Sequence, residues 1–254
     1  MLFSIIIATY NAEDSIEKCL NSIILQSFKD FELIVVDGLS TDQTVHKVYD
    51  LFPRAKIICE KDNGIYDALN KGLKLSEGEW IYVLGSDDKF NDEKVLQDVA
   101  QVANNNVPLI YGNVLSVSEK WSKLIKMRPP EVYRSNKIKC PPIFHQSAFV
   151  NRKYLEETGY YPLFFKIHSD HFLLTRLYHL STPIYINRLI CVYNNQGYSK
   201  ISWKNYFTSS VEQFRINVFF GTSYLVIIRL LIKNFLRTLL GIVGADFLLS
   251  KNSN

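Results

Sequence analysis

The sequence predicts an α/β fold in which helices flank a mostly parallel central sheet. Strand and helix patterns alternate over the first hundred residues, as in successive β-α-β units. The strand candidates at residues 4–8 and 33–36 are apolar without a polar alternation, which is typical of strands buried on both faces. The helix candidates between them are amphipathic, so each can cover one face of a sheet.

The expected elements follow one another without long connections. The first helix places Ile16, Cys19 and Leu20 on one face, and the third has Asn63 as its cap and Gly78 just beyond its end. In chain order we expect a strand at 2–9, a helix at 14–26, a strand at 31–36, a helix at 41–52, a strand at 55–59, a helix at 64–75, a strand at 80–84, a helix at 93–104, a strand at 109–111, a strand at 144–149 and an apolar helix from residue 169.

Length and composition indicate one large domain, or one domain with an appendage. The chain has 254 residues, of which 47% are hydrophobic, enough for a substantial core. The four cysteines show no paired spacing, so neither a zinc site nor a disulfide framework is indicated, and a reducing, cytoplasmic setting fits. The apolar start lacks a basic leader and a cleavage site, which favours a first strand over a signal peptide.

Positive charge is concentrated in one segment. The formal net charge is +4, and seven basic residues stand between Lys120 and Lys139 against one acid, Glu131. The sequence contains no recognised nucleic-acid-binding motif, so we expect no nucleic-acid partner. Phosphate groups of a smaller ligand or a membrane surface fit the segment, and so does a solvated basic loop.

Polar clusters follow three of the predicted strands, where ligands bind in such sheets. Thr9 and Tyr10 end the first strand, Asp37 ends the second, and Asp87 and Asp88 follow the strand at 80–84. Asp37 can accept hydrogen bonds from a base or ribose, the Tyr10 ring can stack, and adjacent carboxylates suit a hard divalent cation. Together they indicate a nucleotide-diphosphate pocket, although each alone also fits a turn, a cap or a core aromatic.

Four ordered motifs resemble those of family 2 glycosyltransferases, which have the nucleotide-diphospho-sugar transferase (GT-A) fold. The resemblance spans roughly residues 2 to 200. The motifs are residues 3–11 (FSIIIATYN), 33–44 (LIVVDGLSTDQT), 60–72 (EKDNGIYDALNKG) and 85–88 (GSDD).

The resemblance implies a role for each strand-end residue. Thr9 and Tyr10 are expected to line the nucleotide pocket, Asp37 to contact the uracil of a UDP-sugar, Asp87 to touch the ribose and Asp88 to bind Mn²⁺ or Mg²⁺. Gly38-Leu39-Ser40 replaces the usual acidic-glycine-serine run after Asp37.

The segment at residues 62–72 is implied to pack beside the nucleotide. Asp62 and Asp67 are therefore donor-site candidates. Capping or bracing of its own helix is an equal alternative for Asp67.

The resemblance also implies that Asp170, in the first turn of its helix, is the catalytic base. A sugar hydroxyl is a poor nucleophile, so a carboxylate must take its proton during transfer. Inversion at the anomeric carbon by single displacement is expected, and a favourable interaction with the helix dipole is the structural alternative for Asp170.

Three histidines are weaker candidates. His168 and His171 flank Asp170 closely enough to share in proton handling or phosphate contact. His145, followed by Gln146, resembles a His-Gln pair near the donor in bacterial members, although a buried, hydrogen-bonded histidine is an alternative. Residues 195–199 resemble a lid loop that has lost its first glycine.

The C-terminal region reads as a helical extension. Arg229, Lys233 and Arg237 recur every four residues in a predicted helix at 224–240, which is amphipathic and too charged for a comfortable membrane span. An interfacial helix on anionic lipid fits, as does a helix packed on the catalytic domain or on a second subunit of a homodimer. The expected domains are a catalytic domain at 1–205, divided into a nucleotide-sugar-binding half at 1–115 and an acceptor-binding half at 116–205, and the extension at 206–254.

The expected activity is transfer of a sugar from a UDP-sugar to a saccharide hydroxyl in bacterial surface-polysaccharide synthesis. The extension makes an acceptor linked to polyprenyl diphosphate, at the inner face of the cell membrane, the expected substrate. The alternatives are a nucleotidyltransferase, whose glycine-rich phosphate loop this chain lacks, and a non-catalytic sugar-nucleotide-binding or scaffold protein. Asp170 argues against the second, because a non-catalytic relative has no use for that carboxylate.

Overall fold

The structure is a computed structural model that describes residues 1–118, 121–195, 203–225, 227–229, 231–232 and 235–236. Its strands are β1 (Phe3–Thr9), β2 (Phe31–Asp37), β3 (Lys56–Cys59), β4 (Trp80–Val83), β5 (Lys89–Phe90), β6 (Leu109–Val117), β7 (Ser122–Ile125), β8 (Ala148–Asn151) and β9 (Ile184–Asn194). Its helices are α1 (Ile16–Ile24), α2 (Thr44–Leu51), α3 (Ile65–Leu75), α4 (Val95–Val102), α5 (Pro130–Ser135), the 3-10 turn η1 (His145–Ser147), α6 (Arg152–Thr158), α7 (Ser169–Leu180) and α8 (Trp203–Phe219).

Within these residues the strands form one sheet in the order β3-β2-β1-β4-β8-β6-β9-β5, with β7 paired to β6. The first four strands in this order are all parallel. Beyond β4 the sheet is mixed, because β8 runs antiparallel to both β4 and β6 while β9 pairs parallel with β6. The predicted α/β fold class is confirmed, with the parallel pairs concentrated in the first half of the chain.

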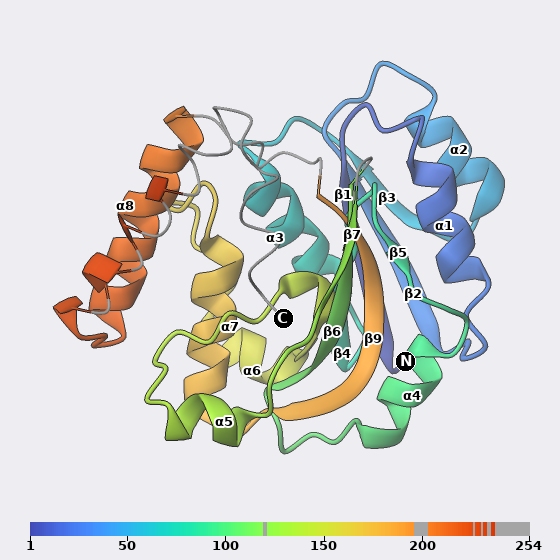
Figure 1. Cartoon of the computed structure of the whole chain (residues 1–254). Coiled ribbons are helices and arrows are strands. Elements are labelled where there is room, and N and C mark those ends of the chain that lie inside the picture. Colours follow the sequence, from blue (N-terminus) through green and yellow to red (C-terminus); the bar gives the residue numbers. More distant parts are fainter. Residues whose placement is uncertain (119–120, 196–202, 226, 230, 233–234, 237–254) are drawn as a thin grey trace.

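Helices cover both faces of the sheet. In Figure 1, α1, α2 and α4 lie on one face, and α3, α6 and α7 lie on the other, with α8 beyond α7. Successive residues of a strand point to opposite faces, so Ile5 and Ile7 enter one core while Ile6 enters the other. This two-sided burial is the reason that β1 and β2 lack a polar alternation.

Two local expectations differ from the structure. Residues 145–147 form the η1 turn instead of a strand, and the Ser147 hydroxyl donates to the Phe144 carbonyl across it. Gly64, with φ 117°, is the N-cap of α3 in place of Asn63. The Asn63 N–H instead donates to Asp67 Oδ2 at 2.9 Å, so Asp67 braces the start of its own helix.

The C-terminal region packs through α8 against α7. Ile216 of α8 is buried in a small hydrophobic cluster with Phe165 and with Phe172 of α7. Lys233 and Arg237 of the predicted basic stripe, and residues 196–199 of the predicted lid, lie outside the described residues. Among the described residues, every helix is too short or too polar to cross a membrane.

Candidate active site

The parallel strands bring the predicted donor-site residues to one edge of the sheet. Thr9 and Asp37 are paired in register at the carboxyl ends of β1 and β2. Gly38 lies directly beside Tyr10 and Asp62, since a Cβ placed on it would stand 3.2 Å from Asp62 Oδ2 and 3.5 Å from the Tyr10 ring. Residues from three separate motifs therefore meet around Gly38.

Two residues at this edge, Thr9 and Tyr10, have side-chain groups available to a ligand. The Thr9 hydroxyl is buried and has no hydrogen-bond partner within the described part of the chain. Buried polar groups usually have a partner, so this hydroxyl is a candidate for a ligand contact. Tyr10 is 63% exposed, which excludes the core-aromatic interpretation and leaves its ring free to stack.

Asp37 is buried and caps its own turn. Its two oxygens accept hydrogen bonds from the Ser40 hydroxyl at 2.5 Å and the Ser40 N–H at 2.8 Å. Leu39 adopts a left-handed conformation with φ 66°, which lets Ser40 turn back. The unusual Gly38-Leu39-Ser40 run thus builds a tight turn that fixes Asp37. A nucleobase that binds Asp37 would have to use the carboxylate lone pairs that Ser40 leaves free.

Lys71, which the sequence analysis did not single out, joins the acids of α3 and the preceding loop. Its ammonium lies 2.7 Å from Asp62, 2.8 Å from Glu60 and 3.8 Å from Asp67. Hydrogen bonds with Asp62 and Glu60 raise the pKa of Lys71. The i,i+4 spacing of Asp67 and Lys71 was the available signal. The lysine therefore offsets the negative charge of these three acids.

Asp87 and Asp88 follow β4 but differ sharply in environment. Asp87 is exposed, whereas Asp88 is 3% exposed and its Oδ1 accepts the Asn194 N–H at 2.8 Å. Burial, opposed by that hydrogen bond and reinforced by the nearby Asp87 charge, raises the pKa of Asp88 to about 7. The absence of a side chain on Gly85 makes room for the buried carboxylate, because a Cβ there would stand 2.6 Å from Asp88 Oδ2.

The Asp88 environment fits a hard divalent cation. A buried carboxylate with a raised pKa gains most from a neighbouring cation, and its oxygens are the ligands that Mg²⁺ and Mn²⁺ prefer. The described residues contain no group of three His, Cys, Asp or Glu side chains arranged for a metal. An ion at Asp88 would therefore need oxygens from a bound diphosphate, which is common for Mg²⁺ sites.

Asp170 lies at the N-terminal end of α7 between two partners. Its Oδ2 is 2.8 Å from His145 Nδ1, and its Oδ1 is 3.0 Å from the Tyr66 hydroxyl. Burial favours the protonated acid, but the hydrogen bond and charge of His145 outweigh it and hold the pKa of Asp170 well below its usual range. Burial correspondingly lowers the pKa of His145, and Asp170 more than offsets this, so the His145 pKa is raised above 6.5.

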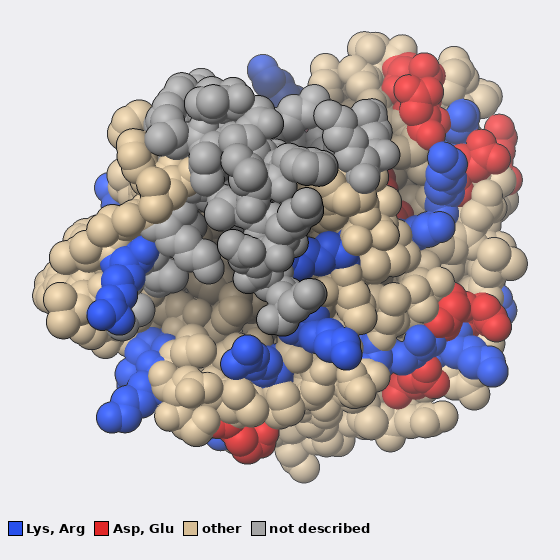
Figure 2. Space-filling view, in the orientation of Figure 1, with Lys and Arg blue, Asp and Glu red and all other residues tan. Residues whose placement is uncertain are grey.

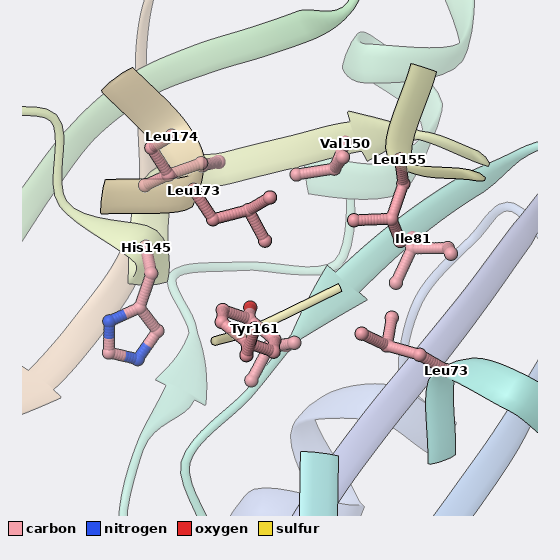
Figure 3. A pocket seen from close by; sticks show the side chains of 10 residues that line it. Leu73, Ile81, His145, Val150, Leu155, Tyr161, Leu173 and Leu174 are labelled. Atoms are coloured by element: carbon pink, nitrogen blue, oxygen red, sulfur yellow. The ribbon is translucent and has the colours of Figure 1, made fainter. Parts of the chain in front are cut away.

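His145 also connects the two groups of acids electrostatically. The Asp88 charge contributes to its raised pKa, so Asp88 and Asp170 act on one imidazole. Leu73, Ile81 and Leu155 line an apolar cavity on the α3 side of the sheet, and His145 stands at its edge (Figure 3). The cavity measures about 10 Å³, room for one water at most, so the exposed sheet edge is the candidate donor site.

His168 and His171 lie on either side of Asp170 at the start of α7. His168 Nε2 lies 2.7 Å from the Ser209 hydroxyl of α8. Burial lowers the pKa of His168, and burial lowers that of His171 to about 4. Both rings are therefore neutral near pH 7, whereas the His145 ring contacts the Asp170 carboxylate, to which the His171 backbone also hydrogen-bonds.

Comparisons with known proteins show which family the chain belongs to. The model of Glycosyl transferase family 2 matches residues 4–169. A PGL/p-HBAD biosynthesis glycosyltransferase of Mycobacterium bovis is 32% identical over 208 residues, covering 77% of this chain and 78% of the relative. The Escherichia coli UDP-Glc:alpha-D-GlcNAc-diphosphoundecaprenol beta-1,3-glucosyltransferase WfaP is 33% identical over 137 residues, covering 52% of this chain and 53% of WfaP.

Solved structures share the fold at low identity. S. aureus TarS 1-349 in complex with UDP-GlcNAc has a TM-score of 0.67 and 21% identity, covering 86% of this chain and 66% of TarS. Glucosyl-3-phosphoglycerate synthase from Mycobacterium tuberculosis, in complex with Mn²⁺, UDP and glucosyl-3-phosphoglycerate, has a TM-score of 0.59 and 16% identity, covering 87% and 81% of the two chains.

The family match extends over most of the chain and includes all four sheet-edge motifs. Its matched segment begins in β1 and ends at Ser169, next to Asp170. The chain therefore belongs to glycosyl transferase family 2 and is a glycosyltransferase.

Proposed function

We propose that this glycosyltransferase moves a sugar from a UDP-sugar to a hydroxyl of a saccharide acceptor, with inversion, and that Asp170 is the base. The observation that carries the proposal is the Asp170 carboxylate, held between Tyr66 and His145, an imidazole on which the Asp88 charge also acts. A single displacement needs a base on the acceptor side of the anomeric carbon.

The donor is proposed to bind along the edge formed by β1, β2 and β4. The exposed Tyr10 ring would stack on the base, and the unpartnered Thr9 hydroxyl and the remaining lone pairs of Asp37 would contact it. Asp87, exposed after β4, would accept hydrogen bonds from the ribose. Asp62 would contact the donor while paired with Lys71, and the lysine charge would limit the repulsion between Asp62 and the diphosphate.

Mn²⁺ or Mg²⁺ is proposed to bind at Asp88. The ion would stabilise the negative charge that develops on the departing diphosphate. The chain's part is to supply a buried, desolvated carboxylate held in place by the Asn194 N–H. Asp67 contributes by bracing α3 at its first turn, since its carboxylate accepts the Asn63 N–H.

The acceptor hydroxyl is proposed to give its proton to Asp170 as its oxygen attacks the anomeric carbon. With neutral His145 beside it, Nδ1–H donates to the carboxylate without adding a positive charge, so Asp170 is a stronger base than a carboxylate that faces an imidazolium. Tyr66, next to the other oxygen, orients the group. His168 and His171 are not needed for this step.

A lipid-linked acceptor at the cytoplasmic face of a membrane fits the surface charge. The side of the molecule with α5 and α7 displays mainly Lys and Arg, whereas acidic side chains gather mainly over α1, α2 and α4 (Figure 2). Lys123 and Lys126 lie in and just after β7, within the 116–205 half proposed to bind the acceptor. The WfaP relative is named for a diphosphoundecaprenol-linked acceptor, which supports this substrate class in bacterial polysaccharide synthesis.

Peripheral membrane binding is proposed to involve the extension at 206–254. Val211, Phe214 and Val218 are exposed along one face of α8, which suits insertion among lipid headgroups. Association with a second copy of the chain is the competing use of this face.

A donor screen tests the proposal. We expect UDP-sugars with Mn²⁺ or Mg²⁺ to raise the melting temperature and to be hydrolysed slowly to UDP, and GDP- and dTDP-sugars to do neither. Stabilisation by GDP- or dTDP-sugars without a response to UDP-sugars would contradict the assigned nucleotide.

A further inference from the structure

Two side chains of α8 hold the loop that leads into α7. Glu212 is 4% exposed and accepts three backbone N–H groups, from Lys166 at 2.7 Å, Ile167 at 3.0 Å and His168 at 2.9 Å. Ser209, one turn earlier, lies 2.7 Å from His168 Nε2. Hydrogen bonds to an ionised carboxylate are among the strongest that a protein makes, so this is a firm attachment between distant parts of the chain.

The attachment continues to Asp170 through one peptide unit. The His168 N–H of that unit donates to Glu212, and its carbonyl, on Ile167, lies 2.5 Å from the Tyr66 hydroxyl. The same hydroxyl lies 3.0 Å from Asp170 Oδ1. The peptide between residues 167 and 168 is thus held from both sides, and its position sets where Tyr66 and Asp170 meet.

We propose that Glu212 is a positioning residue that holds Asp170 in the orientation required for proton abstraction. The inference rests on the proposed role of Asp170 as base. The N–H of His168, the N-cap of α7, lacks a partner within that helix, and the Glu212 carboxylate accepts it together with the two N–H groups that precede it. Because catalytic geometry tolerates only small displacements, loosening this loop misaligns Asp170 without altering the donor edge formed by β1, β2 and β4.

If Glu212 only attached α8 to the rest of the protein, removing another contact of α8 would have the same effect on turnover. Ile216, one turn further along, is fully buried in a cluster with Phe165 and Phe172, and its aliphatic side chain cannot hydrogen-bond to the peptide between residues 167 and 168. Ile216→Ala therefore weakens the attachment of α8 while leaving the three hydrogen bonds of Glu212 available. It is the matched control for Glu212→Gln, which replaces one accepting oxygen by an NH₂ donor.

The test uses the full chain, with water as the acceptor and a UDP-sugar that the donor screen shows to be hydrolysed. We expect Glu212→Gln to lower kcat by about 10- to 100-fold with the donor KM within about twofold of wild type. Its acid limb in the kcat–pH profile should also shift, because the contact of Asp170 with His145 changes. Glu212→Asp should recover part of kcat, and Ile216→Ala should lower Tm with kcat nearly unchanged.

Two results would overturn the inference: a wild-type kcat and pH profile in Glu212→Gln, or an equal loss of kcat in Ile216→Ala. If Glu212→Gln does not fold, Glu212→Asp decides, since a lowered kcat at constant donor KM supports the inference and an unchanged kcat overturns it. Turnover that survives in Asp170→Asn would instead contradict the proposed function. Turnover lost in Asp170→Asn but kept in Glu212→Gln contradicts the positioning role alone.

Discussion

At the scale of single residues, the environment of each carboxylate separates its proposed role. Asp170 faces an imidazole and a phenol, Asp88 is buried and accepts the Asn194 N–H, and Asp87 is exposed. Three acids of similar intrinsic pKa thus differ in charge state and access. Perturbed acids of this kind are typical of active sites.

The His145–Asp170 pair predicts the pH dependence of turnover. While His145 is protonated, its imidazolium depresses the proton affinity of Asp170, so activity should rise with pH as His145 loses its proton, at an apparent pKa above 6.5. In His145→Gln the amide can still donate to Asp170 without a positive charge. We expect kcat to fall about tenfold and the acid limb to move to lower pH, as measured by initial rates of UDP release. An acid limb that stays in place would contradict the pairing.

Asp88 should control metal-dependent donor binding. In Asp88→Asn, we expect the affinity for UDP with Mn²⁺ to fall by about 10- to 100-fold, because the amide cannot supply a charged ligand. The affinity for UDP without metal should change by less than about twofold. Isothermal titration of UDP with and without Mn²⁺ measures both affinities. Asp98→Asn, on α4, is the control for loss of an acid. Equal metal dependence in Asp88→Asn and wild type would remove Asp88 as the ligand.

At the scale of elements, the attachment of α8 to the loop before α7 was the contact that the sequence indicated least. Glu212 is a single acid with no motif around it, and its three partners are backbone N–H groups about 45 residues away. Contacts of this kind depend on tertiary packing and leave no periodic signal. The η1 turn also depends on tertiary packing. Its residues have a strand-like pattern in the sequence, yet they form a turn that places His145 beside Asp170.

The outer face of α8 carries the membrane prediction. Val211, Phe214 and Val218 are 49%, 40% and 42% exposed and share one side of the helix. Replacing all three by Ser should lower cosedimentation with phosphatidylglycerol vesicles by at least about tenfold, since the variant loses the apolar surface that would enter the headgroup region. Leu25→Ser, at an exposed site after α1, is the control. Unchanged sedimentation together with a monomer–dimer shift would point to a second copy of the chain instead.

At the scale of the whole molecule, the first half was predictable in detail because its signals are local. Apolar runs and amphipathic helices gave every element from β1 to β4 within a few residues, and the strand-end rule placed Thr9, Tyr10 and Asp37 at one edge. The mixed half of the sheet was less predictable, since β6, β8 and β9 pair across long stretches of sequence. Ser40 and Lys71, which satisfy Asp37 and Asp62, required the folded geometry.

The arrangement also explains how one fold separates donor and acceptor chemistry. Parallel strands gather the donor candidates, and α7, held by α8 and η1, brings Asp170 from the other half of the chain. The two halves meet at His145, which responds to both Asp88 and Asp170.

The most direct test of the central claim is turnover and UDP binding measured on the same preparation of Asp170→Asn. We expect release of UDP from the UDP-sugar to fall by about 100- to 10,000-fold, the contribution of a general base. UDP with Mn²⁺ should bind within about twofold of wild type, because the donor edge is intact. Turnover near the wild-type rate in Asp170→Asn would contradict the account.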